Sequence, residues 1–321
     1  MKILLQNVTA VTMDPAQPVL KDAFVAVEGT KIASVGTARP QGEFDRVIDG
    51  TGKVLMPGLV NAHTHIPMTL LRGYGGGCDL HTWLNQYIFP AEARLDSRAV
   101  AAGAGLGLAE MIASGVTCVA DMYMHTGTIA EQILEAGISA NLSCGGVYFG
   151  APEDFSPETC GDCRNQAALT EEWHGAGAGQ ILVDASVHGE YTSNPPLWRW
   201  MAEYAAEHRL GMHVHVSETQ SEHQASLERW GKTPIQALDG CGVWDCGRSL
   251  AAHCVYTTEE DWALMAEKGI SCVHNPWSNL KLGSGVAPIP AMMRAGVNVA
   301  LGTDGMSSHN SADLFSDIKL A

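Results

Sequence analysis

From residue 54 onward, short apolar runs alternate with longer helical segments. The runs predict eight buried strands, at residues 59–65, 116–123, 139–147, 181–188, 211–216, 249–255, 271–274 and 298–303. Helices are predicted between and after them, including residues 98–114, 196–208, 258–268, 287–294 and 311–320. A glycine follows each of the first four within three residues, as is common just after a helix end.

Eight alternations of strand and helix favour an α/β fold, a closed (β/α)8 TIM barrel of parallel strands. The alternative is an open, doubly wound sheet. That fold would need a glycine-rich phosphate-binding loop directly after its first strand, and the sequence has none there.

Residues 1–56 follow a different pattern. Short strands at residues 4–13, 24–28, 31–35 and 46–49 are separated by Gly, Asp and Pro, and they predict antiparallel hairpins. The segment is too small to enclose a core alone, so we expect it to pack against another element. The chain is therefore divided into an N-terminal β segment, residues 1–56, and a barrel domain, residues 57–321.

Histidines and acids stand at the ends of several predicted barrel strands. His63 and His65 are two apart on the first strand, and side chains with this spacing point to the same face. His215, His253 and Asp304 stand at or near the ends of the fifth, sixth and eighth strands. Because active sites of (β/α)8 barrels lie at the carboxyl ends of the strands, these side chains predict a metal site there.

Some of these residues have alternative interpretations. His213 and His215 share a strand face; we choose His215 as the ligand because it is closer to the carboxyl end, and the reverse stays open. His253 fits a buried packing residue, a ligand or a residue that orients the attacking water. Glu218 fits either a surface acid or a carboxylate that shuttles protons between water and substrate. Asp304 fits a metal ligand that also accepts the proton of the water.

Three histidines and one carboxylate suit Zn²⁺, the first choice, or Fe²⁺. No lysine ends an early or middle barrel strand, so a carboxylated lysine that bridges two metals has no candidate. One divalent transition metal is therefore predicted.

Composition narrows the class of protein. The 321 residues are 46% hydrophobic and 17% charged, which is typical of a globular protein with a large core. A net charge of −16 argues against a nucleic-acid partner. No apolar stretch reaches the roughly 18 residues of a membrane helix, and the N-terminus does not resemble a signal peptide. Nine cysteines fit buried thiols in a reducing compartment, so we expect a cytoplasmic protein without a membrane partner.

Together, the motifs resemble the amidohydrolase superfamily. They are residues 57–65 (PGLVNAHTH), 215–218 (HVSE), 252–254 (AHC), 274–282 (HNPWSNLKL) and 302–305 (GTDG), in the family's order along nearly the whole chain. The chain is most similar to the branch of purine-nucleoside deaminases acting on S-adenosylhomocysteine and 5′-methylthioadenosine, with triazine hydrolases as cousins.

The resemblance implies a mononuclear site whose ligands are His63, His65, His215 and Asp304. It implies that Glu218 hands a proton to the ring nitrogen and that His253 is the partner of the attacking water. A homo-oligomer is a further implication.

The resemblance also implies substrate contacts. His188 matches a position that contacts the purine. Trp83 and Glu92 match a segment that covers the ligand, in which the acid holds the ribose hydroxyls.

Two departures from the family pattern matter. Relatives that accept the homocysteinyl group hold its carboxylate with arginines, whereas the matching position falls near Cys144 and no arginine occurs between Arg98 and Arg164. Arg164 stays open as a substitute, and so does a smaller nucleoside. In the family, a C-terminal segment joins the N-terminal strands in a β-sandwich. We therefore expect residues 1–56 to be half of a composite sandwich and the barrel domain to be truncated after its eighth strand.

The predicted function is a metal-dependent aminohydrolase that removes the 6-amino group of an adenine nucleoside. 5′-Methylthioadenosine, S-adenosylhomocysteine and adenosine are the candidate small-molecule substrates, giving the inosine analogue and ammonia. A second interpretation is a hydrolase of guanine, cytosine, a pterin or a triazine. Glu218 favours deamination over dechlorination, because loss of chloride needs no protonation. A truncated, inactive binding protein is the third interpretation, against which the intact ligand set argues.

Overall fold

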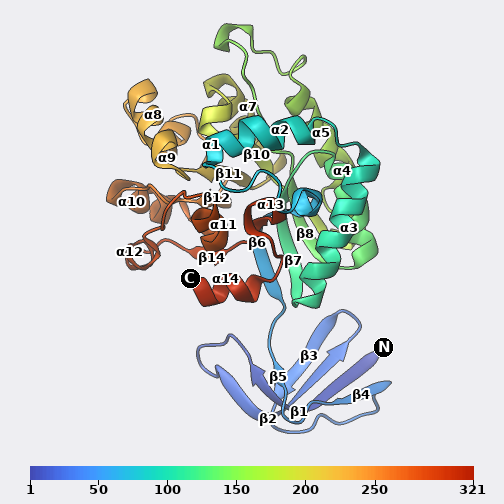
Figure 1. Cartoon of the computed structure of the whole chain (residues 1–321). Helices are drawn as coiled ribbons and strands as arrows, with labels where there is room; N and C mark the ends of the chain where they lie inside the picture. Colours follow the sequence, from blue (N-terminus) through green and yellow to red (C-terminus); the bar gives the residue numbers. More distant parts are fainter. The chain divides into compact units, whose positions relative to one another are not determined.

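The computed structural model describes all 321 residues as two compact units, Met1–Gly58 and Leu59–Ala321 (Figure 1). The division lies two residues after the sequence-based boundary at residue 56. The N-terminal unit is one five-stranded sheet, made of β1 (Lys2–Val11), β2 (Val19–Glu28), β3 (Lys31–Gly36), β4 (Arg46–Asp49) and β5 (Val54–Leu55).

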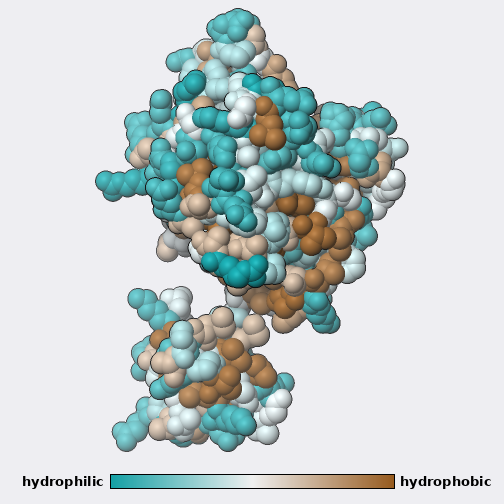
Figure 2. All heavy atoms as spheres, turned by 90° about the vertical axis from the view of Figure 1, so that its left-hand side faces the viewer, coloured by the Kyte–Doolittle hydropathy of each residue, from teal (hydrophilic) through white to brown (hydrophobic).

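The strand directions in this sheet differ in part from the prediction. Strands β1, β2 and β3 pair antiparallel as predicted, but β4 and β5 run parallel to β1. The hairpin prediction was wrong for β4 because the chain after β3 returns to the start of β1 instead of turning back on its neighbour, and β5 was not predicted. The buried cluster is small (Val8, Ala10 and Ala23), and apolar side chains also lie at the surface of the sheet (Figure 2), including Val19, Ile32 and Val47.

The second unit contains two parallel sheets. The first has the order β15-β6-β7-β8-β9, with β6 (Leu59–His65), β7 (Val116–Met122), β8 (Ser139–Ser143), β9 (Ile181–Val183) and β15 (Asp304–Gly305). The second follows chain order, with β10 (Ala185–Gly189), β11 (Met212–Val216), β12 (Ser249–His253), β13 (Ile270–His274) and β14 (Val299–Leu301).

All eight predicted barrel strands are present, but their hydrogen bonds do not close into the predicted single ring. The fourth strand breaks at Asp184, so that β9 pairs with β8 while β10 pairs with β11. The eighth breaks after Leu301, so that β14 pairs with β13 while β15 pairs with β6. At these two seams the chain changes its pairing partner midway. The structure is therefore an α/β fold with parallel sheets.

Helices lie outside the two sheets (Figure 1). The longer ones are α3 (Ser97–Ala113), α4 (Thr126–Ala136), α5 (Gly161–Trp173), α7 (Pro195–His208), α8 (Gln220–Trp230) and α10 (Glu259–Lys268). The shorter ones are α1 (Leu80–Trp83), α2 (Phe89–Glu92), α6 (Ala176–Gly179), α9 (Pro234–Asp239), α11 (Pro276–Lys281), α12 (Ile289–Arg294), α13 (Met306–His309) and α14 (Leu314–Leu320). Three short 3-10 helices are η1 (Ile66–Leu71), η3 (Pro152–Asp154) and η4 (Glu190–Thr192), and η2 (Leu84–Ile88) is a short π-helix. None of these helices combines the length and apolar character that a membrane span requires.

Two glycines of α3 allow close packing below the first sheet's carboxyl end. A Cβ atom at Gly103 would lie 2.5 Å from the carbonyl oxygen of Pro67, and one at Gly107 would lie 2.9 Å from that of Ile66. Both carbonyls belong to η1, the turn that directly follows His65. Because the glycines are four residues apart, they share one helix face, and α3 can approach the turn that supports this histidine.

Asp184 lies between β9 and β10, and its side chain joins this point of the chain to neighbouring segments by hydrogen bonds. Its side chain is 1% exposed and accepts hydrogen bonds from the backbone of Gly211 (2.9 Å), from Arg248 (3.0 Å) and from Asn141. We expect Asp184→Ala to lower the free energy of unfolding by about 1–3 kcal/mol, the cost of leaving a buried donor without a partner. Urea denaturation measures this, with Asp184→Asn as the control that keeps one acceptor for Gly211. Equal stability of the alanine variant and the parent would contradict this role.

Candidate active site

Four side chains converge where strands β6 and β11 end and the short strand β15 begins. Oδ1 of Asp304 lies 3.1 Å from Nε2 of His65 and 3.5 Å from Nε2 of His63. Nε2 of His215 lies 3.2 Å from Nε2 of His65. Ligand atoms placed tetrahedrally around zinc at its usual bond lengths are about 3.3–3.4 Å apart. The three distances between these predicted ligands are thus close to the spacing that one metal ion would require.

The hydrogen bonds of the imidazoles leave their Nε2 atoms available for a metal. Nδ1 of His65 donates to the carbonyl of Met122, and Nδ1 of His215 donates to the carbonyl of His188 at 2.6 Å. A carbonyl oxygen only accepts, so each Nδ1 carries a proton and each Nε2 faces the cluster. Nε2 of His63 is buried and has no hydrogen-bond partner. A divalent cation would satisfy this buried atom, so the residues fit the predicted metal.

Burial also keeps two of these imidazoles in the neutral form that binds metals. It lowers the pKa of His63 to about 3 and that of His215 well below its ordinary value. Neither ring therefore carries a second proton near neutral pH, and the lone pair on Nε2 remains free.

The structure separates the two histidines of β11. His215 reaches the cluster, whereas His213 lies behind His63, with 2.8 Å between its Nε2 and Nδ1 of His63. Nδ1 of His213 is 3.4 Å from the hydroxyl of Ser143. A neutral His213 with its proton on Nδ1 accepts the Nδ1 proton of His63. This contact orients the His63 ring toward the cluster, as second-shell partners of metal ligands commonly do.

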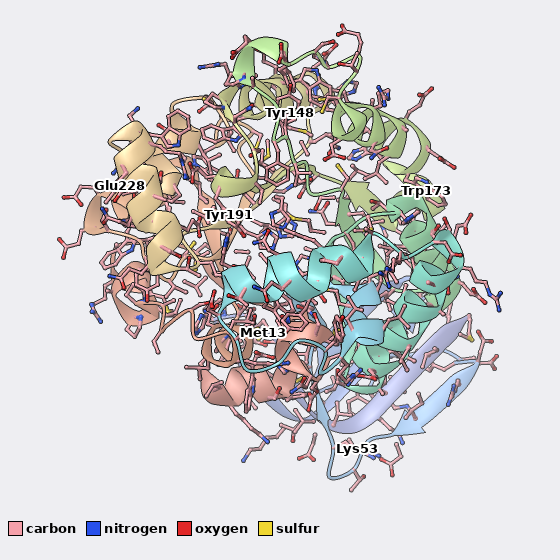
Figure 3. All side chains as sticks on the ribbon, turned by 45° about the horizontal axis from the view of Figure 1, so that its top comes forward. Met13, Lys53, Tyr148, Trp173, Tyr191 and Glu228 are labelled. Atoms are coloured by element: carbon pink, nitrogen blue, oxygen red, sulfur yellow. The ribbon has the colours of Figure 1, made fainter.

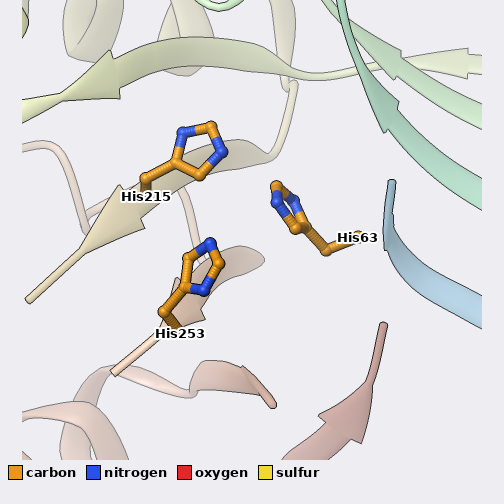
Figure 4. A group of neighbouring side chains, drawn as sticks. All are labelled: His63, His215 and His253. Carbon is orange, nitrogen blue, oxygen red and sulfur yellow. The ribbon is translucent and has the colours of Figure 1, made fainter. Parts of the chain in front are cut away.

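His253 faces His63 and His215 across the cluster (Figure 4), and one ring nitrogen from each of the three lies within 4.8 Å of the others. Nδ1 of His253 is 2.8 Å from the amide oxygen of Asn279, so Nδ1 carries the proton. Nε2 lies 3.7 Å from Oε2 of Glu218. This placement fits either a ligand or a residue that orients water, and it does not fit packing alone.

Glu218 is buried beside the cluster and not at the surface. Burial raises the pKa of its carboxyl group, and the neighbouring His253 opposes the shift. Oε1 accepts a 3.3 Å hydrogen bond from Ser284. A raised pKa favours the protonated form of the carboxyl group, which is the form that a general acid requires.

Backbone strain is concentrated in the same place. Ser217, His253 and Asp304 have φ angles of 49°, 74° and 59°, in the left-handed region that residues with a Cβ atom rarely adopt. Such conformations cost about 1–3 kcal/mol each and persist only where the surroundings hold them. For Asp304, hydrogen bonds from Ser278 (2.6 Å) and Ser308 (3.0 Å) to Oδ2 hold the side chain and leave Oδ1 for the cluster.

A cavity of about 420 Å³ opens above the cluster. The segment formed by α1, η2 and α2 supplies one wall, lined by Leu80, Trp83, Leu84, Ile88, Phe89 and Glu92. Trp83 and Glu92, which the resemblance assigns to a segment that covers the ligand, both line this cavity. His188 also lines the cavity, and its Nδ1 is 3.1 Å from the hydroxyl of Thr192. Burial raises the pKa of the Glu92 carboxyl group.

Several cavity residues had no signal in the sequence. Tyr191 lines the cavity from the turn after β10 (Figure 3), and Met68, Met122 and Phe149 add apolar surface. Helical spacing and strand alternation indicate only whether such residues are buried or exposed. Their arrangement around one cavity depends on the tertiary structure.

No lysine or arginine lines the cavity. Cys144 and the carboxylate of Asp162 do line it. Arg164, the sequence-based candidate for binding a substrate carboxylate, is exposed, and its guanidinium donates to the carbonyl of Glu158 at 2.8 Å. The sequence-based alternative that Arg164 serves as an anion-binding residue therefore has no support in this arrangement.

A histidine and aspartate cluster at strand ends, beside a buried acid and a cavity, is typical of a metal-dependent hydrolase. The chain belongs to the amidohydrolase family, whose sequence profile matches residues 54–321. The resemblance inferred from the motifs is thereby confirmed.

Several similar proteins are named as deaminases of adenine nucleosides. A 5-methylthioadenosine/S-adenosylhomocysteine deaminase of Thermoanaerobacter pseudethanolicus is 39% identical over 321 residues, covering 100% of this chain and 73% of that protein. A 5′-deoxyadenosine deaminase of Methanothermobacter thermautotrophicus is 41% identical over 302 residues, covering 94% of this chain and 70% of that protein. The crystal structure of an adenosine deaminase from Xanthomonas campestris with bound zinc has a TM-score of 0.90 and 35% identity, covering 98% of this chain and 71% of that one.

Proposed function

We propose that this protein is a metal-dependent deaminase that releases the 6-amino group of an adenine nucleoside as ammonia. The observation that carries the proposal is the position of Glu218, a buried acid beside four converging metal-ligand side chains at the base of a cavity. The names of the similar proteins support the same reaction class.

The cavity suits a nucleoside. Its volume of about 420 Å³ lies within the range of about 300–1,000 Å³ usual for small-molecule sites. The apolar wall that includes Trp83 and Phe89 can cover a flat base. Glu92 offers a carboxylate that can accept hydrogen bonds from ribose hydroxyls, and His188 can hydrogen-bond the purine.

One divalent ion, zinc as the first choice and iron as the second, would be held by His63, His65, His215 and Asp304 and would supply a water molecule of lowered pKa as the nucleophile. Glu218 would hand its proton to the ring nitrogen beside C6, which makes that carbon more electrophilic. His253, fixed by Asn279 through Nδ1, would orient the attacking water with Nε2. Asp304 would take up the proton that this water loses.

We also retain the closed (β/α)8 barrel as a proposal for the second unit. At one seam, a bridge joins Gly146 to Val187 of β10. At the other, Asn61 of β6 donates to the hydroxyl of Thr303 at 2.7 Å and accepts from its backbone at 3.0 Å. Both seams are thus crossed by hydrogen bonds outside the regular ladders.

The cytoplasmic location, the homo-oligomer and the role of residues 1–56 as half of a composite sandwich stay predictions. The nine unpaired thiols are compatible with a reducing compartment.

An ammonia-release screen of the zinc-loaded and the iron-loaded protein tests the proposed function. The substrates are adenosine, 5′-deoxyadenosine, 5′-methylthioadenosine, S-adenosylhomocysteine, guanine and cytosine. We expect turnover confined to the adenine nucleosides. Turnover of only guanine or cytosine would establish the alternative hydrolase, and no release from any compound at full metal occupancy would favour a binding protein.

The cavity lining predicts the choice among these nucleosides. A buried carboxylate on a ligand needs a cationic partner, but no lysine or arginine lines the cavity and Asp162 adds a negative group. We expect kcat/KM for 5′-methylthioadenosine or adenosine to equal or exceed that for S-adenosylhomocysteine, by as much as about ten- to a hundredfold, the scale of one charge-assisted hydrogen bond. The three constants are measured under one condition.

A clear preference for S-adenosylhomocysteine that Arg164→Ala abolishes would overturn this prediction. Arg294→Ala, another exposed arginine, is the matched control.

A further inference from the structure

Glu222 is a buried carboxylate, 6% exposed, on the first turn of α8. Its two oxygens accept hydrogen bonds from two consecutive backbone N–H groups. Oε1 accepts from Ser217 and Oε2 accepts from Glu218, each at 2.7 Å. Both donors belong to the turn that leads from β11 into α8, and this turn carries Glu218 into the cavity.

This arrangement differs from ordinary helix capping. Thr219 caps α8, and its hydroxyl accepts the backbone N–H of Glu222 at 3.2 Å. In a capping box the acid at this position would bond the backbone N–H of the capping residue itself. Here the carboxylate reaches past Thr219 to the two residues before it. The sequence pattern Thr-x-x-Glu alone therefore predicts a different contact from the one that forms.

The turn needs an external partner to keep its shape. Ser217 has a φ angle of 49°, a conformation that costs free energy and must be held by its surroundings. The Glu218 side chain itself is weakly held, with one 3.3 Å hydrogen bond from Ser284 and a 3.7 Å separation from His253. Its position in the cavity therefore depends mainly on its backbone, which Glu222 fixes.

We propose that Glu222 is a positioning residue that holds the Glu218 backbone so that the Glu218 carboxyl group reaches the substrate. This inference rests on the proposed role of Glu218 in deamination. Glu222 itself is not among the residues of the ligand cluster or of the cavity lining, so it acts only through its hydrogen bonds to the turn.

Glu222→Gln is the matched substitution, because it keeps the shape of the side chain. Its amide oxygen can still accept one N–H, but its NH₂ group would face the other donor. We expect kcat to fall by about 10–100-fold, the scale of a displacement of about 1 Å at a reacting group. KM and metal content should stay nearly unchanged. Glu228→Gln is the control: it lies on the outer side of the same helix (Figure 3), where its carboxylate accepts only from Gln224 at 3.2 Å, and it should behave as the parent.

A double-mutant cycle separates positioning from a general loss of stability. If Glu222 acts through Glu218, then Glu222→Gln should cause little further loss of kcat in a protein that already carries Glu218→Gln. The same fractional loss in both backgrounds, or parental kcat in the single variant, would overturn the proposal. If Glu222→Gln does not fold, Glu222→Asp enters the same cycle, since it keeps both acceptors but shortens their reach.

Amide hydrogen exchange at residues 217 and 218 provides a readout that needs no activity. It should be faster in Glu222→Gln than in the parent and unchanged in Glu228→Gln. If the metal-loaded parent deaminates no nucleoside, the proposed function fails, and exchange still decides whether Glu222 holds this turn. Unchanged exchange in Glu222→Gln would refute the inference even in an active enzyme.

Discussion

His215→Ala is expected to remove the bound metal and to reduce deamination by at least about three powers of ten, because the ion would contribute several kcal/mol to the reaction. The expectation rests on the position of Nε2, 3.2 Å from Nε2 of His65, with Nδ1 held by the carbonyl of His188. Elemental analysis of the parent should find one transition metal ion per chain, and the variant should have none.

His213→Ala is the informative comparison on the same strand. His213 contacts His63 through Nδ1 of that ring and does not reach the cluster, so its loss should weaken metal affinity by about 10–100-fold without abolishing the site. Metal retained in His215→Ala but lost in His213→Ala would reverse the assignment of the two histidines. Two ions per parent chain would exclude the mononuclear site.

Glu218→Gln is expected to keep the metal but to lose deamination by about two to four powers of ten, the usual contribution of a positioned acid or base. Glutamine has nearly the same size and can still accept from Ser284, but it has no proton to transfer. Glu218 is buried, and glutamine keeps the shape of its side chain without an ionisable proton. The substitution therefore separates the loss of proton transfer from the loss of packing.

The measurement is kcat for the best nucleoside, together with metal content and melting temperature. Parental turnover with unchanged metal would make Glu218 a bystander. Loss of the metal along with activity would instead assign Glu218 a role in holding the ion.

Much of the second unit followed from local pattern. Apolar runs of strand length located all eight strands predicted for this unit, and the five helices specified in advance begin within three residues of their predicted starts. The proposed ligand set also followed from local pattern: the two-residue spacing of His63 and His65 places both on one face, and parallel strands bring their carboxyl ends together. These inferences need only strand geometry and the direction of neighbouring strands.

The arrangement of the cavity could not be read in this way. The hydrophobic pattern between β6 and α3 did not show that α1, η2 and α2 form one cavity wall. Their side chains line the same cavity only in the folded chain. Arg164 looked available in the sequence, but its guanidinium bonds a local carbonyl at the surface. The parallel direction of β4 and β5 likewise depends on the path of the preceding connection.

The sequence by itself determined the strand and helix order, the family and the residue types of the metal site, because these depend on periodicity and short motifs. The tertiary structure decided which histidine of β11 faces the cluster and where the sheets change their pairing partner. It also decided which carboxylate supports Glu218. His63 meets His213 across 150 residues, and Asn61 meets Thr303 across 242. Contacts at such separations depend on how all the strands pack together, and no local pattern of hydrophobic and polar residues specifies them.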